Sequence, residues 1–130
     1  MKLRNAPVMA ILPAADIERA KRFYSEKLGL RSAEFPLVGG DAAFEGADGT
    51  LLYVYTYQGG AEADNTAAGW AVDDVEETVE ELRKKGIAFE QYDMPGLKTD
   101  ERGIADMNVT KAAWFKDTEG NTLAITKIPQ

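Results

Sequence analysis

Short apolar runs separated by polar turns make up most of this chain, and the clearest pair lies near residue 120. Residues 112–115 and 122–125 are rich in residue types that suit a half-buried strand. Residues 117–121 between them are almost all turn formers. This pattern predicts a β-hairpin.

Residues 42–55 carry an earlier copy of the same pattern. Phe44 corresponds to Phe115 and Leu52 to Leu123, and an Asp-Gly pair stands where the later turn has Glu-Gly. A unit that recurs in one chain is typical of an internally repeated fold. We therefore expect the chain to form the same unit twice.

The first unit begins with an apolar run of strand length at residues 7–13, followed by a helix. Asp16 is a good N-cap, and Gly29 supplies the left-handed stop. Apolar residues between them recur at helical spacing: Ile17, Ala20, Phe23, Tyr24 and Leu28. Further strands are predicted at residues 31–38, 42–45 and 50–57, which gives the order βαβββ.

The second unit repeats the order after a linker-like stretch at residues 59–65. A strand is predicted at residues 67–72, and Asp74 with Glu77 forms a capping box for the next helix. The buried stripe of this helix is Val75, Val79 and Leu82, and Gly86 ends the helix. We predict a single α+β domain over residues 1–130, with repeat one at about 7–58, the linker at 59–65 and repeat two at about 66–128.

One segment breaks the symmetry between the two units. The helix caps Asp16 and Asp74 are 58 residues apart, whereas the turn residues Asp48 and Glu119 are 71 apart. The 13 extra residues fall within residues 92–108, which are polar and contain glycine. A segment of this kind is either a functional lid or a mobile connection, and the sequence leaves both open.

Composition narrows the class of protein. The 130 residues suit one globular domain, and they contain no cysteine for a disulfide or a thiolate nucleophile. A net charge of −7 argues against nucleic acid as a partner. No apolar run is long enough to cross a membrane, and the first residues lack the apolar core of a secretory signal. We expect a cytoplasmic protein with neither nucleic acid nor membrane as a partner.

Three stretches of the chain resemble the vicinal oxygen chelate superfamily, which contains glyoxalase I, extradiol dioxygenases and bleomycin resistance proteins. They are AADIERAKRFYSEKLGL at 14–30, WAVDDVEETVEELRKKG at 70–86 and AAWFKDTEGNTLAI at 112–125. The resemblance implies two βαβββ repeats that form a curled mixed sheet around a shared cavity, with the helices outside. It also implies a homodimer, because relatives often share their cavities across a subunit interface.

The enzymes of this superfamily generally hold a divalent metal ion in that cavity. Carried over by the resemblance, their ligand positions correspond to Met9, Tyr53, Ala67 and Ala124, none of which is a usual ligand. The chain contains no histidine at all, and therefore lacks the commonest metal ligand and the commonest general base.

Carboxylates are the remaining candidate ligands, for Mg²⁺, Ca²⁺ or Mn²⁺. The acidic residues at 73–81 are better explained by capping and by the helix dipole. Asp100, Glu101 and Asp106 are a slightly better set, although a solvated loop explains them too. We expect no metal and no other cofactor.

Alternation along the strands assigns side chains to two faces. Ala10, Leu12, Leu52 and Val54 are predicted to face the helices with Trp70 and Val72. The opposite face is then apolar and aromatic, with small residues that leave space for a ligand. The predicted ligand-binding residues on it are Met9, Ile11, Tyr53, Tyr55, Ala67, Trp114 and Ala124.

These observations favour a metal-free protein that binds or sequesters a small, partly aromatic or apolar molecule. The alternative is a glyoxalase-like or dioxygenase-like enzyme with an atypical site, acting on a small carbonyl or aromatic substrate. In that enzyme Tyr53 or Tyr55 would donate a proton, and a closing lid would bring Asp100 or Glu101 to the substrate. A purely structural or regulatory subunit is a third possibility. The sequence does not identify catalytic residues, and whether the protein is an enzyme stays open.

Overall fold

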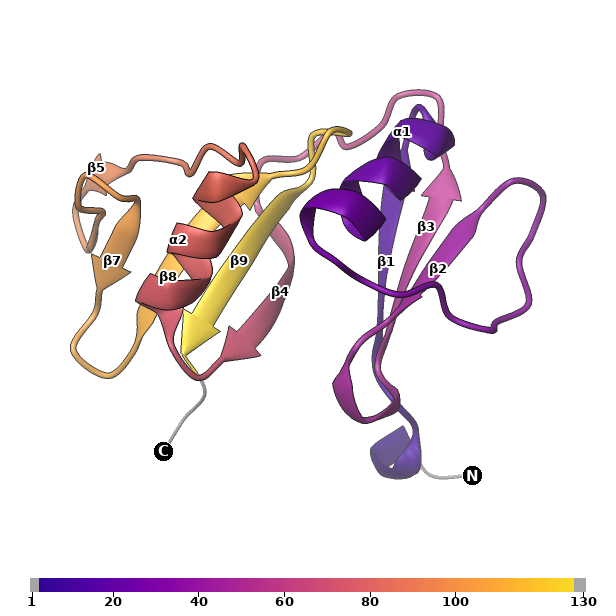
Figure 1. Ribbon diagram of the computed structural model, residues 1–130, viewed down its shortest axis with the longest axis horizontal. Helices are drawn as coiled ribbons and strands as arrows, with labels where there is room; N and C mark the ends of the chain where they lie inside the picture. The colour runs from indigo at the N-terminus through magenta and orange to yellow at the C-terminus, as the bar shows by residue number, and fades with distance from the viewer. Residues whose placement is uncertain (1–2, 128–130) are drawn as a thin grey trace.

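The computed structural model describes residues 3–127, in which two larger β-sheets are each covered by one helix (Figure 1) and a third sheet is a small two-stranded hairpin. In the first sheet the strand order is β1 (Met9–Ala14), β3 (Leu51–Thr56), β2 (Ala42–Glu45). In the second it is β4 (Thr66–Val72), β9 (Thr122–Lys127), β8 (Lys111–Lys116), β7 (Ile104–Asp106). Parallel pairs join β1 to β3 and β4 to β9, and the other pairs are antiparallel. The α+β class with mixed sheets is confirmed. The predicted end of repeat two at residue 128 lies outside the described residues.

The first half follows the predicted order except for one strand, which does not form. Its elements are η1 (Leu3–Asn5), β1 (Met9–Ala14), α1 (Ile17–Arg22), η2 (Phe23–Lys27), β2 (Ala42–Glu45), η3 (Ala47–Gly49) and β3 (Leu51–Thr56). The Asp16 side chain accepts a hydrogen bond from the Arg19 backbone N–H at 3.0 Å and caps α1, as predicted. The helix continues as one π-helical stretch, η2, and Gly29 then adopts a φ of +72°.

The prediction of a strand at residues 31–38 is wrong. This segment makes a single isolated bridge, between Ser32 and Phe44, and otherwise runs as irregular chain. Pro36 lacks a backbone N–H to donate to a neighbouring strand. The first half therefore has a three-stranded sheet with a long loop beside it.

The second half contains β4 (Thr66–Val72), α2 (Val75–Lys84), β5 (Asp93–Met94), β6 (Leu97–Lys98), β7 (Ile104–Asp106), β8 (Lys111–Lys116) and β9 (Thr122–Lys127). Asp74 caps α2 by accepting from the Glu77 backbone N–H at 3.0 Å. Val75 and Val79 are buried beneath the helix, as their spacing predicts. The predicted hairpin is β8–β9, with Trp114 opposite Ala124.

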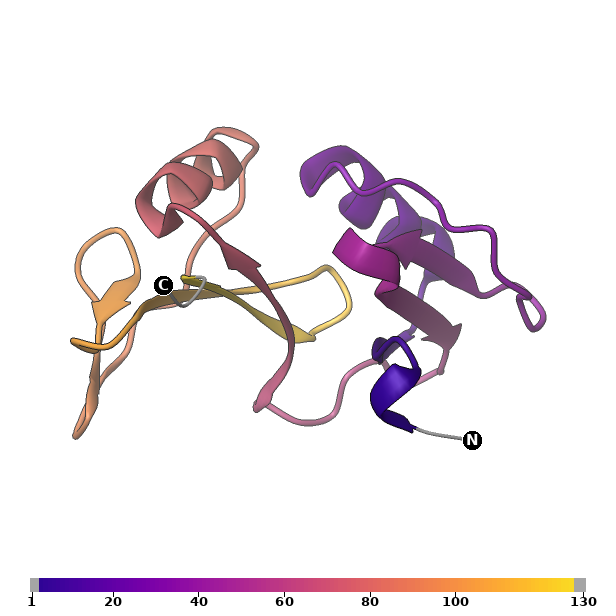
Figure 2. The same ribbon diagram turned by 90° about the horizontal axis from the view of Figure 1, so that it is seen from below.

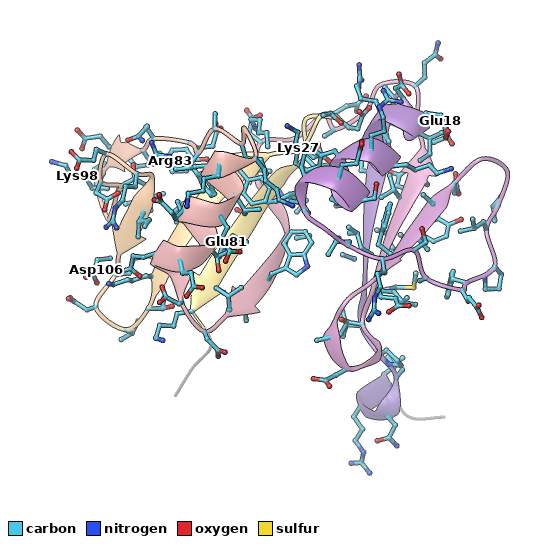
Figure 3. All side chains as sticks on the ribbon, viewed as in Figure 1. Glu18, Lys27, Glu81, Arg83, Lys98 and Asp106 are labelled. Carbon is cyan, nitrogen blue, oxygen red and sulfur yellow. The ribbon has the colours of Figure 1, made fainter. Side chains whose placement is uncertain are left out.

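The additional segment at 92–108 folds against the second sheet. Its first part forms the small β5–β6 hairpin, and its last part forms β7, the edge strand beside β8. Figure 3 shows Lys98 and Asp106 of this segment at the side of the molecule that lies away from the first half.

One apolar core lies between the helices and the sheets of both halves. Leu12, Val54 and Tyr24 from the first half join Phe115 and Leu123 from the second in a single buried cluster. Figure 2 shows both helices on the same side of the sheets. Within residues 3–127, no α-helix covers the opposite faces of the two sheets.

The turn between β8 and β9 joins the second half to the first. The Tyr24 hydroxyl donates to Asp117 at 2.5 Å, and the Asn121 amide donates both to Asp117 and to the Pro13 carbonyl. Glu119 accepts two hydrogen bonds from the Arg19 guanidinium, at 2.8 and 3.1 Å. Because these groups are buried or half-buried, the hairpin turn fixes how the halves meet.

A second contact joins the ends of the helices. The Lys27 ammonium donates to the Lys85 carbonyl at 2.6 Å, and Figure 3 shows Lys27 between the two halves. The edge strands β1 and β4 lie side by side in the middle of the molecule (Figure 1) but are not paired in one sheet. The two sheets thus remain unclosed. Within residues 3–127, no helix has the length and apolarity needed to cross a membrane.

Candidate ligand-binding site

The residues predicted to contact a ligand lie on the sheet faces opposite the helices. Ile11 is paired with Tyr53 on the first sheet, whereas their neighbours Leu12 and Val54 point into the core. On the second sheet, Trp114, Ala124 and Gly69 form a row across three strands. We call these two surfaces the free faces of the first and second sheets.

The free face of the first sheet is partly covered by its own loop. The Tyr53 hydroxyl donates to Asp41 at 2.6 Å and accepts from the Val38 backbone N–H at 3.1 Å, and its ring packs edge-on against Phe35. The hydrogen bond to Asp41 raises the pKa of Tyr53. The bonds from Tyr53 and from the Thr56 backbone N–H lower the pKa of Asp41. Tyr53 therefore holds its proton firmly and keeps the loop in place.

The free face of the second sheet carries a pocket of about 570 Å³. Trp114 of β8 forms its floor, and Tyr92 packs edge-on against this indole with ring centroids 5.6 Å apart. Met94 and Leu97 of the β5–β6 hairpin line it as well, and Met94 is half exposed. We call this the Trp114 pocket. Its volume lies in the range that holds a small molecule.

The charged groups of the Trp114 pocket are on its rim. They are Asp64, Glu90 and Lys116, and Lys116 lies 3.9 Å from Asp64. Burial, together with the charges of Glu90 and Asp64, raises the pKa of Tyr92. The phenol of Tyr92 is therefore neutral at pH 7, and the pocket offers two aromatic surfaces and two apolar side chains.

Sequence reasoning found Trp114 but missed its partners. Tyr92, Met94 and Leu97 belong to the segment 92–108, which the sequence marks as an addition to the repeat. Alternating apolar and polar residues are the signal that would predict such a hairpin. In β5 and β6 this signal is weak, because each strand has only two residues.

The seven predicted residues are divided between two sheets. Met9, Ile11, Tyr53 and Tyr55 belong to the first, and Ala67, Trp114 and Ala124 to the second. Ala124 is only 5% exposed at the centre of its row, so it offers little surface to a ligand. Of the seven, Trp114 is the residue that lines the pocket on the second sheet.

Comparison with known families identifies the family to which this fold belongs. The model of the glyoxalase/bleomycin resistance protein/dioxygenase superfamily matches residues 6–125. The chain belongs to this superfamily. A search of curated proteins found no match to the chain.

Several solved structures share the superfamily fold with this chain. TnmS3, an antibiotic binding protein from Streptomyces sp. CB03234, is 21% identical with a TM-score of 0.68, and the match covers 100% of both chains. A glyoxalase/dioxygenase from Nostoc punctiforme is 18% identical with a TM-score of 0.68, over 100% of this chain and 97% of that one. The oxidase ChaP-H2 is 22% identical with a TM-score of 0.61, over 95% and 94%. At these identities the likeness is one of fold.

The residues of this chain do not fit the metal of the superfamily's enzymes. The four positions implied by the resemblance carry a thioether, a phenol and two methyl groups, and the chain has no histidine. Among residues 3–127, no group of three or more acidic side chains is arranged to hold an ion.

Two of the acidic residues considered as ligands, Glu76 and Asp100, have other partners. Glu76 accepts from the Lys111 ammonium at 2.7 Å, which lowers the pKa of Glu76. Asp100 accepts from Arg102 and from the Ile104 backbone N–H. Burial alone would raise the pKa of Asp100, but these hydrogen bonds lower it. Asp100 thus holds the turn before β7.

Proposed function

We propose that this protein binds a small, partly aromatic or apolar molecule in the Trp114 pocket, without a metal ion. The observation that carries the proposal is the edge-on pair of Trp114 and Tyr92 in a pocket of about 570 Å³ on the free face of the second sheet. Flat aromatic rings with apolar neighbours favour a ligand of that kind. TnmS3 is described as an antibiotic binding protein, which supports binding as a role for the fold.

The β5–β6 hairpin supports the same proposal. It places Met94 and Leu97 at the pocket, and methionine adapts readily to ligands of different shape. The Tyr92 carbonyl accepts from the Thr99 backbone N–H at 2.9 Å, and the Thr99 hydroxyl accepts from the Tyr92 backbone N–H at the same distance. The aromatic wall is therefore fixed by the hydrogen bonds between the Tyr92 backbone and Thr99.

The test uses the two tryptophans of the chain. In a Trp70→Phe variant, Trp114 is the sole indole, and the neutral aromatic probe N-phenyl-1-naphthylamine is titrated against its emission. We expect saturable quenching with one probe per chain. Tyr92→Ala in the same background should weaken binding about tenfold, because one aromatic wall is lost.

Tyr57→Ala is the matched control, since Tyr57 is a tyrosine with 45% exposure outside the pocket. It should leave the affinity for the probe unchanged. Equal affinities of the Tyr92 and Tyr57 variants, or quenching that does not saturate, would overturn the proposal.

The enzymatic alternative has less support from the residues. The Tyr53 hydroxyl is engaged in a hydrogen bond to Asp41, and Asp100 accepts a hydrogen bond from Arg102 in the other half of the molecule. Turnover of a small carbonyl or aromatic compound that disappears in Tyr53→Phe would favour this alternative over binding alone.

We further propose that the protein is a homodimer. Ile11 is 57% exposed on β1, the edge strand of the first sheet, and Met94 is 50% exposed on the second half. Side chains of this kind are often covered in an interface. A second copy that covered both surfaces would bring together the predicted ligand-binding residues, which are divided between the two free faces.

A further inference from the structure

A second pocket lies between the two halves, away from the Trp114 pocket. It has a volume of about 490 Å³ and is lined by β1, β3, β4 and the η3 turn. Trp70 and Leu52, which line it, also belong to or pack against the core on the helix side of the sheets. We call it the Trp70 pocket.

The pocket exists because the edge strands β1 and β4 do not pair. The β8–β9 turn and the bond between Lys27 and Lys85 join the halves elsewhere. Along the pocket, β4 carries only small residues beside Trp70: Ala68, Gly69 and Ala71. A larger residue at Gly69 is disfavoured, because a Cβ there would lie 2.9 Å from the Ala124 carbonyl oxygen.

The walls of the Trp70 pocket are apolar. Val8, Leu30 and Leu52 line it together with the half-buried Trp70. The indole presents the best π-surface of any side chain for a cation. The pocket is therefore suited to an apolar body with a positive charge beside the indole.

The charges at the pocket are negative. Within residues 3–127, the charged side chains that line it are Glu45 and Asp48. Arg31 lines the adjoining hollow, where its guanidinium lies 3.7 Å from Glu45, but its side chain is 86% exposed and solvent screens this pair. A cationic ligand is thus attracted and an anionic one repelled.

The turn that carries Asp48 is well defined. Asp48 has a φ of +55° and Gly49 a φ of +81°, and the Thr50 backbone and hydroxyl both donate to the Ala47 carbonyl. A fixed turn holds the backbone of Asp48 at the pocket, which lowers the cost of ordering this residue when a ligand binds.

We infer that the Trp70 pocket is a second binding site, for a small organic cation with an apolar body, such as a quaternary ammonium. It uses different residues from the Trp114 pocket and does not depend on the function proposed above.

The experiment uses a Trp114→Phe variant, in which Trp70 is the sole indole. Three probes are titrated against its emission: benzyltrimethylammonium, its uncharged counterpart neopentylbenzene and the anion benzenesulfonate. The expected result is a saturable change with one cation per chain, at least about tenfold weaker binding of the uncharged probe, and no saturation with the anion. Equal binding of cation and uncharged probe, or no saturation with the cation, would overturn the inference.

Two substitutions test the carboxylates. Glu45→Gln and Asp48→Asn should each weaken the binding of the cation about three- to tenfold. The affinity for the uncharged probe should stay unchanged. Asparagine accepts the left-handed conformation of residue 48, so the turn is kept, and the melting temperature of each variant checks this. Glu34→Gln, an exposed acid outside the pocket, is the matched control and should have no effect. Cation affinity that survives both substitutions together would contradict the inference.

Because Trp114 reports one pocket and Trp70 the other, the two proposals fail separately. If N-phenyl-1-naphthylamine gave no saturable quenching of Trp114 in the Trp70→Phe variant, the proposed function would be wrong and the cation site would stand. If the cation gave no saturable change of Trp70 emission in the Trp114→Phe variant, the cation site would be wrong and the proposed function would stand.

Discussion

At the scale of single residues, Glu119 is a buried acid that joins the two halves of the molecule. Its side chain is fully buried, and it accepts from the Arg19 guanidinium, the Asp16 backbone N–H and the Thr118 hydroxyl. Burial alone would raise the pKa of Glu119, but these hydrogen bonds and the charge of Arg19 lower it to about 2. Glu119 thus links the last hairpin to the start of α1 as an ionised carboxylate.

Replacing this carboxylate should destabilise the protein. We expect Glu119→Gln to lower the free energy of unfolding by about 2–3 kcal/mol, because the amide cannot accept both bonds from Arg19. Urea denaturation followed by circular dichroism at pH 7 measures it. Glu18→Gln is the control: Glu18 is an exposed acid on the neighbouring helix (Figure 3) in an ion pair of 3.2 Å, and its loss should change little.

The same carboxylate makes stability depend on pH. The pKa of Glu119 is lower in the folded chain than its ordinary 4.5, so its contribution is complete above about pH 4.5 and is lost as the pH falls toward 2. It amounts to about 3 kcal/mol. Asp41, Glu76 and Asp100 also have lowered pKa values and add to the trend. The difference in unfolding free energy between the wild type and Glu119→Gln should therefore shrink from pH 5 to pH 2, and a constant difference would contradict this assignment.

At the scale of elements, helices were easier to predict than strands. Both helix caps and both glycine stops stand where the sequence places them, because capping depends on residues within one turn. The strand expected at residues 31–38 failed, because its apolar residues had no partner strand that the sequence could reveal. The hairpin β5–β6 was missed because two-residue strands carry no periodic signal.

The close pairing of β4 with β9 predicts that a side chain at Gly69 destabilises the protein. Gly69→Ala should destabilise the protein by about 1–2 kcal/mol, because the new Cβ would lie 2.9 Å from the Ala124 carbonyl oxygen. Gly40→Ala is the matched control, since a Cβ there meets nothing within 4 Å. Thermal unfolding of both variants measures the effect. If the two variants melted at the same temperature, the close approach of β4 and β9 would be wrong.

At the scale of the whole molecule, the two halves share a core but leave their free faces open. The halves are held by the β8–β9 turn and by Lys27, while the sheets do not close around a common space (Figure 2). The pockets therefore lie on the second sheet and between the halves.

The proposed homodimer is tested at this scale. Ile11→Glu places a charge in the free face of the first sheet and should weaken association at least about tenfold, because the interface would have to bury that charge. Sedimentation velocity over a range of concentrations measures it. Val109→Glu is the control: Val109 is 94% exposed in the loop before β8, and its substitution should leave association unchanged. A wild-type chain that stayed monomeric throughout would remove the homodimer proposal.

The sequence by itself determined the helices with their caps and stops, the terminal hairpin and the faces of its strands. These features follow from the order of nearby residues, since period and capping act over a few positions. Tertiary structure alone decided that Tyr92, Met94 and Leu97 meet Trp114, that Glu119 pairs with Arg19, and that a pocket opens beside Trp70. These contacts join residues far apart in the chain, and their geometry depends on how two sheets and a long insertion pack together, which no local pattern specifies.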